Sequence, residues 1–168
     1  MAEPAIEERP SRRLDHVLAR HVSRLGPLGL SPVAPGTLGA MTAIPVAALL
    51  GDGRPWAWAA AIAGLAIVGF AAVAIHLRER EETDPRDVVI DEALGCLIAT
   101  AFVPCDPVWI AAAFVGFRAL DILKPWPVSS IDERVHGAFG VLADDVAAGS
   151  LAGGIAAMVR ALVSLLGA

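Results

Sequence analysis

The sequence predicts an all-α membrane protein, a compact bundle of about five membrane-embedded helices with an amphipathic helix at its N-terminal end. The chain has 168 residues, 56% of them hydrophobic, and a mean hydropathy of +0.63. That composition is too apolar for an ordinary soluble domain. Apolar runs of helical length recur along the chain, and residues 56–75 contain no charged side chain at all. The net charge of −5 gives no basic footprint, so no nucleic-acid partner is expected.

The N-terminal region predicts a tail followed by a basic helix. Residues 1–13 begin with a polar, acidic stretch and no apolar core, so we expect a disordered tail rather than a cleavable signal. Residues 14–168 are expected to form a single domain. Apolar residues then recur at helical spacing, at Leu14, Val17, Leu18, Val22 and Leu25. This pattern predicts an amphipathic helix that lies either at the membrane surface or against the protein's own bundle.

Prolines, glycines and charges predict the boundaries of the other helices. Residues 26–37 contain three prolines and three glycines and should form a shaped loop. Helices are expected over 37–50, 56–75, 88–103 and 108–123, and from Asp144 or Asp145 to about Leu166. Residues 76–87 should be a solvated connection, 104–107 a tight turn and 124–143 a long loop. Several of these helices are short for a hydrocarbon core of roughly 30 Å, so the number of crossings stays open.

The polar residues gather at predicted helix ends. If each apolar helix crosses once, four polar segments share one side of the membrane: Gly36-Thr37, Asp91-Glu92, Arg118 to Lys124, and Asp144-Asp145. Of the 13 Lys and Arg residues, all except Arg54 and Arg160 lie on or near that side. The positive-inside rule therefore predicts a multi-pass protein whose polar side faces the cytoplasm. Charge within so hydrophobic a protein is costly, which indicates a functional role.

The polar residues have the chemistry of a phosphate site. Five carboxylates at one membrane face repel one another unless cations hold them: Asp91, Glu92, Asp121, Asp144 and Asp145. Oxygen ligands of this kind suit Mg²⁺. Arg118 offers a bidentate fork and Lys124 a point charge for phosphate oxygens, while Gly36 and Thr37 begin a helix. The structural alternative is that the acids pair with the nearby cations and His136 only to hold the bundle together.

Small residues follow two of the acids at intervals of four: Gly95 and Ala99 after Asp91, and Gly149 and Gly153 after Asp145. Small residues at this interval allow helix backbones to approach closely in a membrane. We therefore expect Asp91 and Asp145 to lie at the mouth of a tight helix contact, deeper than their neighbours.

The motifs of phosphatases that form covalent intermediates are absent from this sequence. Neither cysteine has an arginine six positions later, and there is no Asp-x-Asp-x-Thr segment. Metal-activated water attacking phosphorus fits the inventory best. Two other classes stay open: a cation-coupled or proton-coupled transporter, and a phosphatase for another lipid or for a soluble phosphomonoester.

Four segments closely resemble phosphatidylglycerophosphatase A of bacteria, in the same order: GLSPVAPGTLG at 29–39, VIDEALG at 89–95, FRALDILKPWP at 117–127 and VHGAFGVLADDVAAG at 135–149. The resemblance covers roughly Leu25 to the C-terminus. It implies a Mg²⁺-dependent enzyme of phospholipid biosynthesis in the bacterial inner membrane, which converts phosphatidylglycerophosphate into phosphatidylglycerol and phosphate. It also implies an all-helical fold with one central helix surrounded by others. The site residues it implies are Thr37, Asp91, Glu92, Arg118, Asp121, Lys124, His136, Asp144 and Asp145.

A mechanism hypothesis follows from this resemblance. One or two Mg²⁺ ions on Asp91, Asp121 and either Asp144 or Asp145 bridge the phosphomonoester and activate water, and Glu92 is a further ligand or the base. The substrate lipid enters sideways from the membrane while its charged head stays in water.

The remaining residues take roles around the phosphate in the same hypothesis. Arg118 and Lys124 stabilise the charge that builds on its oxygens. The backbone of Gly36 and the side chain of Thr37 hold it. His136 protonates the leaving alkoxide.

Overall fold

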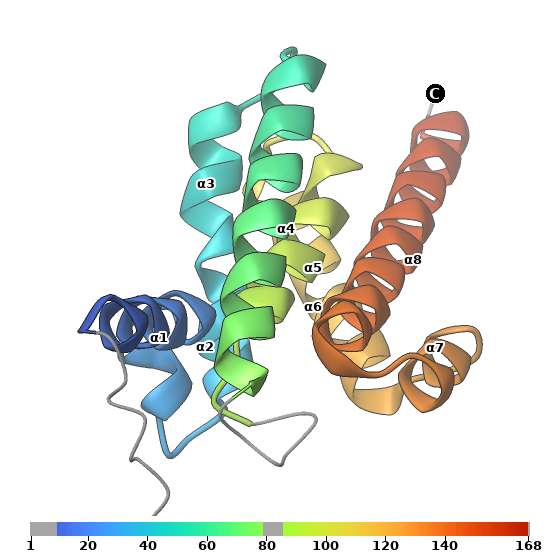
Figure 1. Cartoon of the computed structure of the whole chain (residues 1–168). Coiled ribbons are helices and arrows are strands. Elements are labelled where there is room, and N and C mark those ends of the chain that lie inside the picture. Colours follow the sequence, from blue (N-terminus) through green and yellow to red (C-terminus); the bar gives the residue numbers. More distant parts are fainter. Residues whose placement is uncertain (1–9, 79–85, 168) are drawn as a thin grey trace, which may run out of the picture.

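The computed structural model describes residues 10–78 and 86–167, and all regular structure within these ranges is helical (Figure 1). This confirms the all-α prediction. The elements in chain order are α1 Pro10–Ser23, a short 3-10 turn Leu28–Leu30, α2 Pro35–Met41, α3 Ala43–Leu50, α4 Pro55–Leu77, α5 Ile90–Ala101, α6 Pro107–Leu123, α7 Val128–Arg134 and α8 Gly137–Leu166.

The centre of the bundle is the short helix α5. Ten of its 12 residues are buried, and it packs against α2, α3, α4, α6 and α8. At 1.5 Å per residue it is roughly 18 Å long, too short to cross a bilayer alone. The helix is therefore enclosed by protein, in agreement with the central helix that the family resemblance implies. Phe117 and Leu94 are fully buried in the apolar clusters that surround it.

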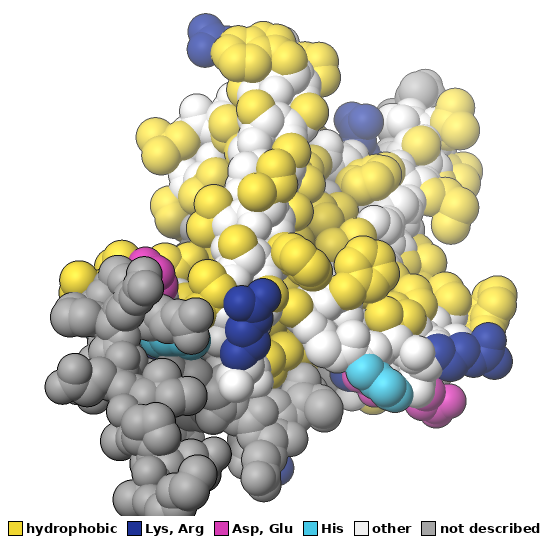
Figure 2. Space-filling view, in the orientation of Figure 1, with side chains coloured by type: hydrophobic (Ala, Val, Ile, Leu, Met, Phe, Trp, Pro, Cys, Tyr) yellow, Lys and Arg dark blue, Asp and Glu magenta, His cyan; other side chains and the backbone are white. Residues whose placement is uncertain are grey.

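Two of the outer helices are long and apolar enough to cross a membrane. They are α4, with 23 residues, and α8, with 30. Only 17% of the most hydrophobic stretch of α4 and 22% of that of α8 are buried, whereas the core helix of a soluble protein is mostly buried. Hydrophobic side chains cover the outward surfaces of both helices in Figure 2. Such large exposed apolar surfaces favour a membrane protein.

Helix α1 turns its larger apolar side chains away from the bundle. It begins at Pro10, earlier than the predicted Leu14, and lies across the end of α4 (Figure 1). Its fully buried residues are small: Ala19 and Ser23. The predicted apolar positions at Leu14, Val17 and Leu18 are 49 to 64% exposed. The first part of the predicted stripe thus faces away from the bundle, whereas Val22 and Leu25 of the same pattern pack against the core.

The chain just after α1 fixes the segment that leads into α5. The backbone carbonyl of Ser23 accepts a hydrogen bond from the amide of Val89 at 2.9 Å. The guanidinium group of Arg24 forms an ion pair with Asp87, whose carboxylate also lies 3.7 Å from Nε2 of the buried His76. These contacts join α1, α4 and the entry to α5. The predicted connection over 76–87 is helical as far as Leu77, and residues 79–85 lie outside the described ranges.

The prediction of a long loop over residues 124–143 is wrong. The structure places α7 in this segment and begins α8 at Gly137, so Asp145 lies about two turns inside a helix rather than at its start. The glycines suggested a loop, but Gly140 is required by packing. A Cβ atom there would lie 2.2 Å from the carbonyl oxygen of Val135.

The predicted helix over 37–50 is divided in two at Thr42. Pro45 accounts for the break, because a proline has no amide hydrogen and its ring clashes with the carbonyl group four residues earlier, here that of Met41. At the break, the carbonyl of Gly39 accepts hydrogen bonds from both the hydroxyl of Thr42, at 2.6 Å, and its backbone amide, at 3.1 Å. The other helices agree with the prediction to within a few residues at their ends.

Helices α5 and α8 approach each other through glycine, as the spacing predicted. A Cβ atom on Gly149 would lie 2.1 Å from the carbonyl oxygen of Gly95, and one on Gly153 would lie 2.9 Å from that of Ala99. A Cβ on Gly95 would in turn lie 2.7 Å from the carbonyl oxygen of Asp145. The backbones therefore touch without side chains between them. This contact holds the acidic ends of the two helices together.

We expect Gly149→Ala to lower the stability of the protein, because the added methyl group would force α5 and α8 apart. Overpacking of this kind costs about 1–3 kcal/mol in free energy of unfolding. Gly154→Ala is the matched control, since nothing lies within 4 Å of a Cβ atom at that neighbouring position. Thermal unfolding in detergent, followed by circular dichroism, should show a lower melting temperature for the first variant only. Equal melting temperatures would contradict the close contact.

Candidate active site

A cavity of about 670 Å³ opens at the end of the bundle where α2, α5, α6, α7 and α8 meet. Its volume is typical of a site for a small molecule and exceeds the needs of a lone phosphate group. All of the residues predicted for the site line this cavity: Gly36, Thr37, Asp91, Glu92, Arg118, Asp121, Lys124, His136, Asp144 and Asp145. The convergence expected from the helix topology is therefore present in the structure.

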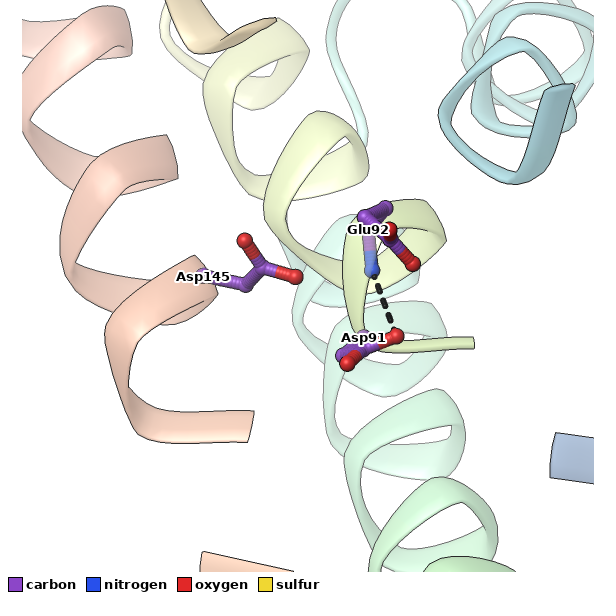
Figure 3. A group of neighbouring side chains, drawn as sticks. All are labelled: Asp91, Glu92 and Asp145. Carbon is purple, nitrogen blue, oxygen red and sulfur yellow. Dashed lines mark hydrogen bonds between the residues drawn. The ribbon is translucent and has the colours of Figure 1, made fainter. Parts of the chain in front are cut away.

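Three carboxylates form a cluster at this site. Asp91 and Glu92 lie in the first turn of α5, and Asp145 reaches them from α8 (Figure 3). One oxygen atom from each lies within 4.8 Å of the others. Asp91 and Asp145 are buried, with 8% and 4% of their surfaces exposed. The acids thus come together from distant parts of the chain, where the glycine contact of α5 and α8 positions them.

The cluster fits a hard divalent cation. Two carboxylates at this separation repel each other by roughly 3 to 4 kcal/mol at an effective dielectric constant of about 20. Oε2 of Glu92 and Oδ1 of Asp145 are buried and have no hydrogen-bond partner. Buried charged oxygens without partners are costly, and a bound cation would satisfy them. Carboxylate oxygens are the ligands that such cations prefer.

The start of α2 lies against this cluster because residue 36 is glycine. A Cβ atom on Gly36 would lie 2.1 Å from Oε1 of Glu92 and 3.3 Å from Nη2 of Arg118. The preceding residues shape the approach: Ala34 has a left-handed backbone (φ 45°), and Pro35 occupies the first turn of the helix. Proline is well suited to that position, where its missing amide hydrogen costs no hydrogen bond. The shaped loop predicted from the sequence therefore forms one wall of the cavity.

Two cations line the cavity, and both contact acids. Nη1 of Arg118 lies 2.5 Å from Oδ2 of Asp121, one helical turn later on α6. Nζ of Lys124 lies 2.5 Å from Asp132 and 2.8 Å from Asp144, so it connects the end of α6 to α7 and α8. Burial alone would lower the pKa of Lys124, but its hydrogen bonds to the two aspartates outweigh that effect and raise the pKa. Lys124 consequently stays protonated at any pH near neutrality.

Both cations keep hydrogen-bond donors for a ligand. An ammonium group has three N–H donors, of which Lys124 uses two, and a guanidinium group has five. Nε of Arg118 is buried and has no hydrogen-bond partner in the structure. Asp121 and Asp144, predicted as metal ligands, here contact these cations and do not belong to the group of three carboxylates whose oxygen atoms lie within 4.8 Å of one another.

The lining of the cavity is negative overall. It includes six carboxylates but only three Lys or Arg side chains, together with His136. An anionic ligand would be repelled by this excess unless additional cations bound with it. The excess of negative charge is thus a second reason to expect a metal ion when phosphate binds in this cavity. It is independent of the oxygen atoms that lack hydrogen-bond partners.

Sequence reasoning missed two of the charged lining residues, Arg86 and Asp132. Asp132 lies on α7, in the segment that was expected to be a loop, and no spacing rule links it to Lys124. Arg86 belongs to the connection that was expected to be merely solvated. The sequence does contain one indication that Arg86 could line the site: it is the last cationic residue before the helix that carries Asp91.

Known proteins similar to this chain were found by two kinds of comparison. The family model described as phosphatidylglycerophosphatase A matches residues 21–160. The phosphatidylglycerophosphatase A of Escherichia coli (strain K12) is 38% identical over 129 residues, which cover 76% of this chain and 74% of that protein. A Bacteroides thetaiotaomicron protein with the provisional name phosphatidylinositol-3-phosphatase is 38% identical over 134 residues, 72% of this chain and 80% of its own length.

A third relative, the phosphatidylglycerophosphatase A of Haemophilus influenzae, is 44% identical over 66 residues, or 39% of this chain and 40% of that protein. No solved structure matches the chain. The matched region holds all of the cavity residues described above, from Gly36 to Asp145. With its family model and its relatives in agreement, the chain belongs to the phosphatidylglycerophosphatase A family of phosphatases.

Proposed function

We propose that this protein hydrolyses the terminal phosphomonoester of phosphatidylglycerophosphate, giving phosphatidylglycerol and phosphate, with Mg²⁺ as cofactor. The observation that carries the proposal is the buried cluster of Asp91, Glu92 and Asp145 beside Arg118 and Lys124 in one cavity. Acids that bind a metal and cations that bind phosphate oxygens are the two components that metal-assisted hydrolysis of a phosphomonoester uses. The family supports this substrate.

Asp91, Glu92 and Asp145 are the residues that would hold Mg²⁺. The chemistry such an ion supplies is neutralisation of charge on phosphate oxygens and a lowered pKa of bound water. The three acids approach from two helices whose backbones touch at Gly95 and Gly149, so their separation is fixed before any ligand binds. This preorganisation reduces the rearrangement needed at the moment of reaction.

Arg118 and Lys124 would bind the oxygens of the phosphomonoester. Each is held by an acid that the sequence had suggested as a metal ligand, Asp121 for Arg118 and Asp144 for Lys124. We assign these two acids to orienting the cations. Gly36 permits the start of α2 to lie beside Glu92, where backbone amide groups of the loop can contact phosphate.

His136 would protonate the oxygen of the departing glycerol group. Its side chain is exposed and lines the cavity at the start of α8, so it lies where the leaving group meets solvent. A general acid at such a position stabilises the alkoxide as it forms.

We place the cavity at the cytoplasmic face of the inner membrane. Helices α4 and α8 would span the bilayer, and the charged side chains in view gather mainly at the end that bears α1 and α7 (Figure 2). Arg54 precedes α4 and Arg160 is near the end of α8, and both of these helix ends lie at the end of the bundle away from α1 and α7 (Figure 1). Helix α1 would lie in the interface with Leu14, Val17 and Leu18 toward the lipid, because these side chains have no cover in the bundle.

Purified protein in detergent micelles should release phosphate from phosphatidylglycerophosphate when Mg²⁺ is present and stop when EDTA is added. Asp91→Asn should lower the rate by about 100-fold or more, the scale expected on loss of a group in a preorganised site. Phosphatidylinositol 3-phosphate and glycerol 3-phosphate serve as comparison substrates. Faster hydrolysis of either one would assign the enzyme to a different phosphomonoester, and EDTA-resistant release would exclude the metal.

The Asp145→Asn variant allows metal binding to be tested without measuring catalysis. Without metal, the variant should melt at a higher temperature than the wild type, because one of three mutually repelling carboxylates is gone. Addition of Mg²⁺ should raise the melting temperature of the wild type but not that of the variant. Glu133→Gln, which removes an exposed acid on α7 outside the cavity, is the control and should respond to Mg²⁺ like the wild type. A full Mg²⁺ response in Asp145→Asn would show that the cluster is not the metal site.

The orientation of α1 can be tested with an environment-sensitive fluorophore on Leu18→Cys, in a background where Cys105 is replaced by alanine. In liposomes its emission should shift to shorter wavelength and be quenched by spin-labelled lipid, because the side chain contacts acyl chains. The same label on Glu133→Cys, which is exposed on α7, should show neither the shift to shorter wavelength nor the quenching, because it contacts water. Identical spectra at the two positions would place α1 outside the bilayer.

A further inference from the structure

Arg86 is a cation of the cavity for which the proposed chemistry has no use. Its side chain is exposed and lines the cavity, and it forms no ion pair with any residue in the described ranges 10–78 and 86–167. Arg118 and Lys124 differ in this respect, because both contact acids. The neighbouring acid, Asp87, is engaged with Arg24. Arg86 is thus available to an anionic ligand.

Arg86 belongs to a different part of the cavity wall from the other two cations. It is on the segment entering α5, four residues before the buried start of that helix, whereas Arg118 is on α6 and Lys124 directly follows the last residue of α6. Arg118 lies close to Glu92, since both approach the position that a Cβ on Gly36 would occupy. The cavity lining therefore combines the buried carboxylates of Asp91 and Asp145 with an exposed guanidinium group, that of Arg86, which has no acidic partner among residues 10–78 and 86–167.

The chemistry of the substrate requires a second anion-binding group. On the proposed function, the reacting phosphomonoester is joined through glycerol to a phosphodiester, which carries a permanent negative charge. A volume of about 670 Å³ accommodates both groups. The excess of acids in the lining would repel the diester unless a cation met it.

We propose that Arg86 binds the phosphodiester of the lipid substrate, forming a subsite that selects lipids with a diester in addition to the terminal phosphomonoester. A guanidinium group suits this task because its parallel N–H donors match two phosphate oxygens. The inference rests on the proposed function and specifies its substrate class. Phosphatidic acid, a lipid phosphomonoester without a diester, is the substrate that this subsite cannot recognise.

The test compares phosphatidylglycerophosphate with phosphatidic acid of the same acyl chains in the same neutral detergent micelles. Arg86→Gln should raise the KM for phosphatidylglycerophosphate on the order of tenfold, the effect of losing one charged hydrogen bond, and leave phosphatidic acid unaffected. The KM of Arg86→Lys for phosphatidylglycerophosphate should lie between those of the wild type and Arg86→Gln, because lysine keeps the positive charge but lacks the parallel N–H donors. Arg78→Gln is the matched control, since Arg78 is an exposed arginine at the end of α4 that does not line the cavity.

A second measurement does not depend on turnover of the diester substrate. Short-chain phosphatidylglycerol, which has the diester and lacks the phosphomonoester, should inhibit the wild-type enzyme competitively and inhibit Arg86→Gln about tenfold more weakly. Equal effects of the substitution on both substrates, or unchanged inhibition by phosphatidylglycerol, would overturn the subsite. Failure of the wild type to release phosphate from phosphatidylglycerophosphate would instead overturn the proposed function, so the two failures are distinguishable.

Discussion

The repulsion between Asp91, Glu92 and Asp145 is the constraint on which the rest of the structure depends. Three carboxylates this close would separate if the chain could move, and the fold prevents it at the contact of α5 with α8. Only hydrogen atoms fill the space between Gly95 and Gly149, so the backbones of the two helices hold each other in register. The bundle can therefore be regarded as a rigid support that keeps like charges together. The oxygen atoms of Glu92 and Asp145 that lack hydrogen-bond partners are the reason to expect a bound cation here.

Much of the site could be predicted because a bundle of apolar helices restricts where polar groups can lie. The alternation of apolar runs and short connections placed Gly36, Asp91, Arg118 and Asp145 at one end, and the structure finds them in one cavity. The four-residue spacing of the glycines predicted the close contact for a physical reason, since positions four apart on a helix share a face. The family resemblance then supplied the reaction that such a site performs, and the family match agrees with it.

The remaining features depend on contacts between segments far apart in the sequence. Two glycines at 137 and 140 suggested a loop, whereas Gly140 is small because the carbonyl group of Val135 occupies the adjacent space. The direction of α1 could not be read from its stripe, because only the packed structure shows that Ala19 and Ser23 face the bundle. Likewise, the ion pair between Lys124 and Asp132 could not be predicted. Asp132 is placed by α7, a helix that was not expected from the sequence.

The aspartate doublet of α8 illustrates how one short segment can do two tasks. Consecutive helical residues point about 100° apart around the axis. Asp145 consequently turns toward the acids of α5, while Asp144 turns toward the ammonium group of Lys124. The two side chains are not interchangeable copies, and neither can replace the other without a rotation of the whole helix. The order of the two residues along α8 thus decides which acid joins the carboxylate cluster and which one holds Lys124.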